Sequence, residues 1–363
     1  MSWIILYGLA WLVATVLAVI LTGVCRVLAP RLGLLDVPLH EAHKSHRQPT
    51  PVAGGIAMCL AWLATLFGGI AIGCLGKDLL PAEISHILPG IKAVWRNLLL
   101  ISAVAVGFTA LGVWDDWRSM PAWRKFLLQF LLAAVSASWG PRLTLGLSSP
   151  VLGWVVTVFW TMTVINALNF FDNMDGLAGG TAALACLFLV LVASIRGQHF
   201  VAMLGSAAGG SALGFLAHNR PPAKIFMGDG GSHFLGYCLA VLATLTTYYM
   251  PGESPTATPV LIPLLVLAIP LFDAAAVIVL RLRLHLPIYV GDNRHISHRF
   301  VNLGLSRGYA VLLVCLLCFI AGASAVTLLW LPPAGVCLVF AHTGALLALV
   351  SIIQFYIPEA NRK

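Results

Sequence analysis

The chain has 363 residues, of which 60% are hydrophobic and only 9% are charged, and its formal net charge is +8. Its mean hydropathy is +0.95. Soluble domains carry about 25% charged residues, so this composition excludes an ordinary soluble protein, which needs a polar surface. We attribute the positive charge to the loops of a membrane protein, and expect no nucleic-acid partner.

Apolar segments of about 20 residues, long enough to cross a hydrocarbon core of about 30 Å as helices, recur along the chain. The first has no basic residue ahead of it, and is therefore expected to be a membrane helix rather than a cleaved signal peptide. The sequence predicts an all-α integral membrane protein, a single domain over 1–363, with about eleven spans. They are expected at approximately 2–29, 53–75, 95–114, 122–139, 150–168, 177–196, 200–217, 232–250, 259–280, 307–330 and 334–356.

Loop charge decides the orientation, because an odd number of spans places the termini on opposite sides. With the N-terminus outside, 16 of the 21 Lys and Arg residues fall in cytoplasmic segments and five fall outside. Positive residues favour the cytoplasmic side, so we predict an external N-terminus and a cytoplasmic C-terminus. The same orientation places seven of the nine aspartates at the cytoplasmic face of the inner membrane, where we expect the functional residues.

The first polar segments at this face carry charges of both signs. Lys44 and His46 lie in the first predicted loop, Asp115 and Asp116 follow the third span, and Lys125 begins the fourth. Two adjacent carboxylates repel each other, so a nearby cation or metal ion is expected to keep both ionised. An isolated Asp pair at a helix end is more often simply solvated, and alone it indicates little.

Four amide and carboxylate side chains then follow at a spacing of three residues. They are Asn166, Asn169, Asp172 and Asp175. Residues three apart lie near one another on a helix face. Their oxygen atoms are suited to Mg²⁺, with Mn²⁺ as an alternative, and Mg²⁺ often keeps water and phosphate oxygens in its other positions. The structural alternative is Asn and Asp capping helix ends around a glycine turn.

Two later segments complete this set. Asp229 lies in a glycine-rich turn just before the eighth predicted span, where the backbone can approach a ligand closely and a helix N-terminus favours anions. His295, His298 and Arg299 form a basic cluster before the tenth span. A metal site at the histidines and an ordinary positive loop are alternatives, but such a basic loop favours a phosphate group.

One membrane face thus gathers oxygen ligands for a hard cation together with basic loops. This combination suits a diphosphate, because a metal ion and cationic side chains neutralise its charge during phosphoryl transfer. A lipid acceptor would explain why such a site lies at the bilayer surface.

At these residues the chain resembles the polyprenyl-phosphate N-acetylhexosamine-1-phosphate transferase family, which includes undecaprenyl-phosphate GlcNAc-1-phosphate transferases and the MurNAc-pentapeptide translocase. The resemblance covers about 30 to 306 and includes five motifs in the family's order. It implies Mg²⁺-dependent transfer of a sugar 1-phosphate from a UDP-sugar to undecaprenyl phosphate, releasing UMP and starting the synthesis of a lipid-linked envelope glycan such as O-antigen. Direct displacement is favoured over an aspartyl-phosphate intermediate. A homodimer is left open.

The resemblance also implies roles for individual residues. Asp115 matches the acid that deprotonates or orients the lipid phosphate, and Lys125 matches a lysine that meets the diphosphate. Asn169 and Asp229 match positions that coordinate Mg²⁺. The predicted catalytic residues are Asp115, Asp116 and Asp229, and the predicted substrate-binding residues are Lys44, His46, Lys125, Asn166, Asp172, Asp175, His295, His298 and Arg299.

Three positions depart from the family's pattern. Ser119 stands where a fuller DDxxD motif would have an acid, Asn173 where Gly is usual, and Ser297 at a position often filled by His. The first two leave the reaction type intact. Ser297 and the lack of a run of three histidines argue against the MurNAc-pentapeptide branch, so a GlcNAc-type or related amino-sugar donor is expected.

Two hypotheses from other functional classes compete with a transferase. A transporter would use Asp273, within the ninth predicted span, as a substrate or proton site. Transporter sites lie near the membrane midplane, whereas most aspartates here crowd one face, so Asp273 is expected to support that face instead. A non-catalytic scaffold would leave the clustered acids unexplained.

Overall fold

The computed structural model describes residues 3–37, 49–75, 87–143, 149–250, 252–287 and 294–356. The helices are α1 (Trp3–Leu28), α2 (Gly54–Leu75), α4 (Ile87–Trp117), α5 (Ala122–Trp139), α6 (Pro150–Phe171), α7 (Leu177–Ile195), α8 (His199–Asn219), α9 (Gly228–Leu245), α10 (Ile262–Val266), α11 (Ala268–Arg283), α12 (Ile296–Asn302), α13 (Arg307–Thr327) and α14 (Pro333–Tyr356). Two short strands, β1 (Leu35–Asp36) and β2 (Thr50–Pro51), pair antiparallel. The prediction of an all-α polytopic membrane protein agrees with this architecture.

Eight helices in the described part of the chain are long and apolar enough to cross a membrane, and a bent pair, Thr258–Val266 with Ala268–Arg283, would be a ninth span. The total of about eleven stays a prediction, because it also requires α5 and α9. Both are less apolar at their starts, where α5 carries Arg124 and Lys125 and α9 carries Asp229. Both nevertheless pack against α4 and α6.

The ninth predicted span, at approximately 259–280, is a bent pair of helices, because α10 and α11 meet at an angle of 67°. Pro270 lies in the first turn of α11. A proline lacks the backbone N–H and crowds the carbonyl of the residue four positions earlier, which here is Val266, the last residue of α10. The break therefore follows from the sequence and separates a short buried helix from the one that carries Asp273.

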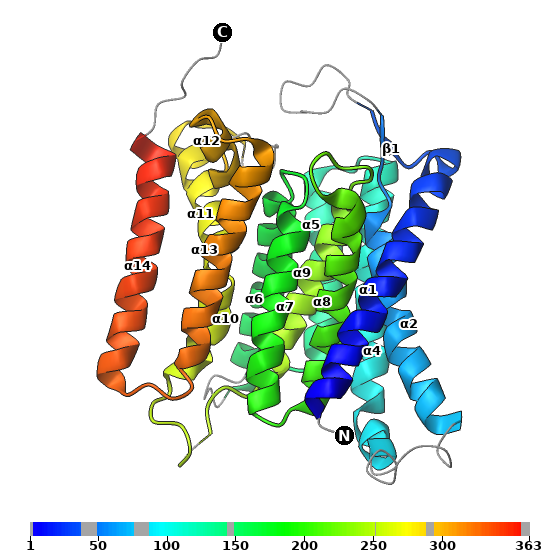
Figure 1. Ribbon diagram of the computed structural model, residues 1–363, viewed down its shortest axis with the longest axis vertical. Helices are drawn as coiled ribbons and strands as arrows, with labels where there is room; N and C mark the ends of the chain where they lie inside the picture. The colour runs from blue at the N-terminus through cyan, green and yellow to red at the C-terminus, as the bar shows by residue number, and fades with distance from the viewer. Residues whose placement is uncertain are drawn as a thin grey trace.

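Figure 1 shows that α1 begins at one end of the helical bundle and that α14 ends towards the other. The end at which α14 finishes also holds β1 and α12. Successive helices alternate in direction, so the last turn of α4 and the first turn of α9 come together there. Segments that are far apart in the sequence thus share one face of the bundle.

Exposed tryptophans surround the connection between α4 and α5 at this end. Trp114, Trp117 and Trp123 are 55%, 54% and 63% exposed. The guanidinium of Arg118 lies 4.6 Å from the ring centre of Trp117, and that of Arg124 lies 5.2 Å from the ring centre of Trp123. Tryptophan is enriched where a membrane protein passes from hydrocarbon to headgroups, so we place this connection at the membrane–water interface.

The start of α9 packs tightly between two other helices through glycine. A Cβ atom added at Gly55 of α2 would collide with the backbone of Gly230 and Gly231. One added at Gly112 of α4 would collide with the backbone of Asp229 and Gly230. Small residues let helices approach this closely within a membrane, where packing supplies much of the association energy. These two glycines therefore fix the position of Asp229.

Buried polar side chains connect α5 to α9 below this crossing. Gln129 hydrogen-bonds the ring of His233 at 2.9 Å and accepts from the amide of Asn166 at 3.0 Å. Deeper in the bundle, the hydroxyls of Ser136 and Tyr237 are 3.0 Å apart. A polar side chain buried between membrane helices needs a hydrogen-bond partner in the protein, because no water is available to form that bond. The pairs thus hold α5, α6 and α9 in one register.

We predict that Gly112→Ala destabilises the protein by about 1–3 kcal/mol, the usual cost of overpacking a core, because the added methyl group meets rigid backbone. Gly90→Ala in the same helix is the control, since a Cβ atom there meets nothing within 4 Å. The measurement is the thermal unfolding midpoint in detergent. An unchanged midpoint for Gly112→Ala would show that α4 and α9 can separate without cost.

Candidate active site

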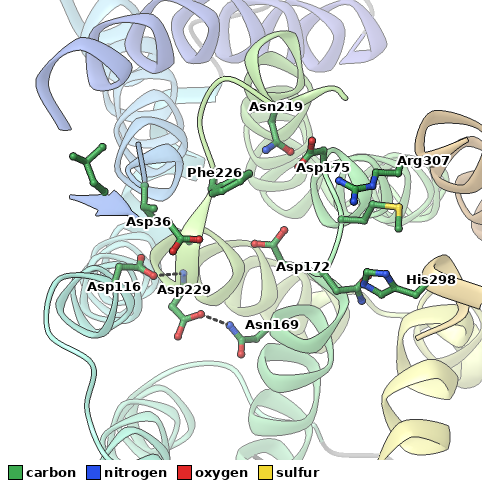
Figure 2. A pocket seen from close by; sticks show the side chains of 15 residues that line it. Asp36, Asp116, Asn169, Asp172, Asp175, Asn219, Phe226, Asp229, His298 and Arg307 are labelled. Atoms are coloured by element: carbon green, nitrogen blue, oxygen red, sulfur yellow. Dashed lines mark hydrogen bonds between the residues drawn. The ribbon is translucent and has the colours of Figure 1, made fainter. Parts of the chain in front are cut away.

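A pocket of about 490 Å³ lies at the end of the bundle where α9 begins. Figure 2 shows Asp116 and Asp229 on one side of it, His298 and Arg307 on the other, and Asp172 between them. The polar and charged residues of its wall are Asp36, Asp116, Asn169, Asp172, Asn173, Asp175, Asn219, Asp229, His298 and Arg307. They come from β1, α4, α6, α8, α9, α12, α13 and the segment between α6 and α7.

The carboxylate of Asp116 caps the N-terminus of α9. Its oxygens accept hydrogen bonds from the backbone N–H groups of Asp229 at 2.9 Å and Gly230 at 3.1 Å. Gly228, which precedes them, has a φ of 66°, and a side chain there would collide with this carboxylate. Asp116 thus satisfies N–H groups that have no partner inside the helix, and it orients Asp229.

Lys125 lies between two carboxylates on neighbouring helices. Its Nζ is 3.0 Å from Asp115 and forms a second, short contact with Asp229. Asp115 also accepts a hydrogen bond from the backbone N–H of Met120 at 2.8 Å, which fixes its orientation at the end of α4. Asp115 is not among the residues that line the pocket. The predicted cation beside the aspartate pair is therefore Lys125, which joins Asp115 to the pocket residue Asp229.

Only part of the predicted series of amides and acids faces the pocket. Asn169 donates through Nδ2 to Asp229 at 2.7 Å and to Ser232 at 2.9 Å, so it fixes the Asp229 carboxylate. Asn166 lies outside the pocket wall and donates instead to Gln129. Asn166 thus lies away from the pocket, whereas Asn169 lies beside Asp229.

Asp172 ends α6 and faces the centre of the pocket. Burial raises the pKa of its carboxyl group well above the usual range, and the charges of Asp229, Asp116 and Asp175 raise it further. Asp175 is itself fixed, because it accepts a hydrogen bond from the backbone N–H of Ala223 at 2.9 Å. The pocket therefore concentrates negative charge around Asp172.

The basic cluster is positioned by an acid within the bundle. The fully buried Asp273 contacts the ring of His295 at 2.6 Å and accepts from the backbone N–H of Ile296 at 2.8 Å. Of the three predicted residues, only His298 lines the pocket, while His295 and Arg299 are buried behind it. Asp273 therefore supports the site face, as expected, and this contact gives no support to a transport pathway.

His298 faces the pocket as a neutral group. Burial lowers the pKa of its imidazole to about 4, and the nearby charges of His295 and Arg307 contribute to the shift. A neutral imidazole offers one donor and one acceptor nitrogen. His298 is therefore suited to hydrogen bonding rather than to pairing with charge at neutral pH.

The oxygen atoms of this pocket fit a hard divalent cation. No group of three or more His, Cys, Asp and Glu side chains within the described residues forms a complete metal site. Mg²⁺ does not need one, since it commonly binds one or two carboxylates together with water and substrate phosphates. Asn169, Asp172 and Asp229 provide such oxygens, and a divalent cation would relieve the crowding of charge that raises the pKa of Asp172.

Sequence reasoning missed Asp36, Asn219 and Arg307 in the pocket wall. Asn219 accepts from the N–H of Gly176 at 2.8 Å and donates to the carbonyl of Ile225 at 2.9 Å, so it ties the start of α7 to the end of α8. Only its place in a polar segment could have indicated this. The predicted Lys44 and His46 lie outside the described residues.

The chain is similar to known proteins over most of its length. Residues 98–247 match the model of glycosyl transferase family 4. The chain is 32% identical to a probable undecaprenyl-phosphate N-acetylglucosaminyl 1-phosphate transferase of Bacillus subtilis, with 88% of this chain and 84% of that protein aligned. It is 30% identical to a decaprenyl-phosphate N-acetylglucosaminephosphotransferase of Mycobacterium tuberculosis (85% and 79% aligned) and 33% identical to a phospho-N-acetylmuramoyl-pentapeptide-transferase of Geobacillus kaustophilus (57% and 64% aligned). With such identity over most of its length, the chain belongs to glycosyl transferase family 4, the family of these polyprenyl-phosphate sugar-1-phosphate transferases.

Proposed function

We propose that this protein transfers N-acetylglucosamine 1-phosphate, or a closely related amino-sugar 1-phosphate, from a UDP-sugar to undecaprenyl phosphate and releases UMP. The observation that carries this proposal is the pocket at the start of α9, where carboxylate and amide oxygens lie beside Lys125 on one side and His298 and Arg307 lie on the other. A diphosphate and a hard cation need this combination of charges.

The relatives support an N-acetylglucosamine donor over a MurNAc-pentapeptide donor. The relatives named for N-acetylglucosamine in Bacillus subtilis and Mycobacterium tuberculosis align over 85–88% of this chain, whereas the pentapeptide transferases align over 57–67%. Ser297, in a position often filled by His, also fits a donor other than the pentapeptide. The product would be the first lipid-linked intermediate of an envelope glycan.

The site is proposed to face the cytoplasm from the inner membrane. Positive residues favour the cytoplasmic side, and the end of the bundle that holds the pocket also holds the basic last turns of α1 and α11 and the basic first turn of α5. UDP-sugars are made in the cytoplasm, which agrees with this orientation.

In the proposed reaction, an oxygen of the lipid phosphate attacks the β-phosphorus of the donor, and UMP leaves. Lys125 would bind the diphosphate, because its ammonium group contacts Asp229 of the pocket wall. Asp115, on the other side of Lys125, would orient the acceptor phosphate and accept its proton where one is present. A divalent cation held by Asn169, Asp172 and Asp229 would neutralise charge on the diphosphate.

We first predict that purified protein in membranes containing undecaprenyl phosphate transfers label from UDP-GlcNAc into the lipid fraction when Mg²⁺ is present. The measurement is thin-layer separation of the lipid product, with UMP release quantified in the same reaction. Parallel reactions with UDP-GalNAc and UDP-MurNAc-pentapeptide define the donor. Failure to label lipid from any of the three donors, with folded protein, would reject the proposed function.

The second prediction concerns the cation. Burial and the neighbouring acids raise the pKa of Asp172, so its carboxyl group keeps its proton to a higher pH than usual, whereas a bound cation favours the ionised form. Mg²⁺ binding should therefore release protons and tighten as the pH rises. Isothermal titration calorimetry in buffers of different ionisation enthalpy measures both effects.

Variants separate the pH dependence of cation binding, which we assign to Asp172, from the cation affinity that Asp229 and Asn169 provide. Asp172→Asn should remove most of the pH dependence, whereas Asp229→Asn should weaken Mg²⁺ binding about tenfold or more at every pH. Asn169→Ala should also raise the Mg²⁺ concentration needed for activity, because it removes an oxygen ligand. Wild-type behaviour of the Asp229 and Asn169 variants at limiting Mg²⁺ would remove these residues from the cation site.

The third prediction concerns the acceptor. Asp115→Asn should lower kcat by about 100-fold, in the range of a lost general base, while UDP-sugar affinity measured without lipid stays near wild type. A phosphate monoester loses its second proton near pH 6, so the loss should be proportionally larger below about pH 6.5. Loss of donor binding with normal dependence on the acceptor would instead assign Asp115 to the nucleotide site.

A further inference from the structure

Two anchors hold the short helix α12 against the pocket. At its N-terminus, Asp273 binds the ring of His295 and the backbone N–H of Ile296. The second anchor is Asn173, which lies in the pocket wall between α6 and α7. The first anchor comes from within the bundle. The second comes from the pocket wall, so Asn173 links the position of α12 directly to the pocket.

The side chain of Asn173 makes two hydrogen bonds at this point. Its Nδ2 donates to the carbonyl of Phe170 at 3.0 Å, which fixes the amide, and its Oδ1 accepts from the hydroxyl of Ser297 at 2.6 Å. Its backbone also interacts with the side chain of His298, the residue after Ser297. One residue thus contacts two consecutive residues of α12, and Ser297 is fully buried behind the pocket wall.

The contact between Asn173 and Ser297 joins distant parts of the chain. The two residues are 124 positions apart in the sequence, yet their side chains form one hydrogen bond. They therefore form one local arrangement, because the Asn173 amide and the Ser297 hydroxyl satisfy each other.

We propose that Asn173 and Ser297 are positioning residues that hold His298 in the wall of the donor pocket. This inference rests on the proposed function, since it assigns the pocket to the UDP-sugar. His298 shares the pocket with Asn173 and Arg307. The pair acts on the donor through His298 and not through a direct bond from Ser297, which is buried behind the wall.

The physical reason is the neutrality of His298. A charged group attracts a diphosphate over several ångströms, so small displacements change its effect little. A neutral imidazole acts only through a hydrogen bond, which weakens steeply as its angle and distance depart from the optimum. Because its pKa is lowered to about 4, His298 is a neutral imidazole at neutral pH and therefore needs a fixed position.

The test is a set of double-mutant cycles with UDP-GlcNAc as the donor. Ser297→Ala and Asn173→Ala should each raise the donor KM about fivefold, the worth of one hydrogen bond, while kcat changes by less than about twofold. The double variant Asn173→Ala with Ser297→Ala should be no worse than the poorer single variant. Should Ser297→Ala fail to fold, Asn173→Ala tests the same contact.

A second cycle tests whether the pair acts through His298. His298→Ala should raise the donor KM at least as much as Ser297→Ala does, and adding Ser297→Ala to His298→Ala should change nothing further. Ser136→Ala is the matched control, because it removes another buried serine hydroxyl that hydrogen-bonds Tyr237 away from the pocket. It should lower the unfolding midpoint and leave the donor KM unchanged.

Three outcomes would overturn the inference. The effects of Asn173→Ala and Ser297→Ala on the donor KM could be additive, or Ser297→Ala could raise the donor KM of the His298→Ala variant as much as it does in the wild type. Ser136→Ala could also raise the donor KM as much as Ser297→Ala does. The wild-type reaction is measured first, which keeps the two hypotheses apart. A wild type that does not transfer from any UDP-sugar rejects the proposed function, whereas an active wild type with additive variants rejects only the positioning role.

Discussion

The buried N-terminus of α9 ties the membrane scaffold to the chemistry of the site. Its first N–H groups have no helical partner, and Asp116 of α4 accepts hydrogen bonds from two of them. Gly55 and Gly112 allow α2 and α4 to approach the same turn without side chains between the backbones. Asp229 is therefore held by backbone contacts from two helices, and its carboxylate enters the pocket from a rigid position.

Charge within the pocket is unevenly distributed. The five aspartates that line it are Asp36, Asp116, Asp172, Asp175 and Asp229, while Lys125 contacts Asp229 from outside the pocket wall and Arg307 lies on the far side. Burial, together with the charges of the neighbouring acids, raises the pKa of Asp172. A site with surplus negative charge is poorly suited to a diphosphate alone, but well suited to a diphosphate that arrives with a divalent cation.

Hydrophobic blocks were sufficient to predict most helix boundaries, since α5 covers the predicted 122–139 and α2 begins one residue after the predicted 53. The break before Pro270 was not predicted, although a proline disrupts the preceding helical turn and the sequence therefore contained its cause. The series from Asn166 to Asp175 was harder. A step of three residues turns a helix about 300°, so the series drifts by about 60° at each step, and Asn166 turns towards Gln129.

Contacts between distant segments set the limit of prediction from sequence. The resemblance aligned Asp116 and Asp229 with functional positions, but nothing local indicates that the first caps the helix of the second. Likewise, the hydrogen bond between Asn173 and Ser297 joins the segment between α6 and α7 to α12, which are far apart in the sequence. Local pattern identifies which residues carry the chemistry, and packing decides which of them meet.

The exposed tryptophans at the connection between α4 and α5 have a consequence for how the site meets its acceptor. Trp114, Trp117 and Trp123 hold the end of α4, and with it Asp115, at a fixed depth in the interface. A lipid phosphate at that depth diffuses in two dimensions. Its encounter rate with the protein then depends on its mole fraction among the membrane lipids, and adding inert lipid slows the encounter even when the amount of acceptor per volume is constant.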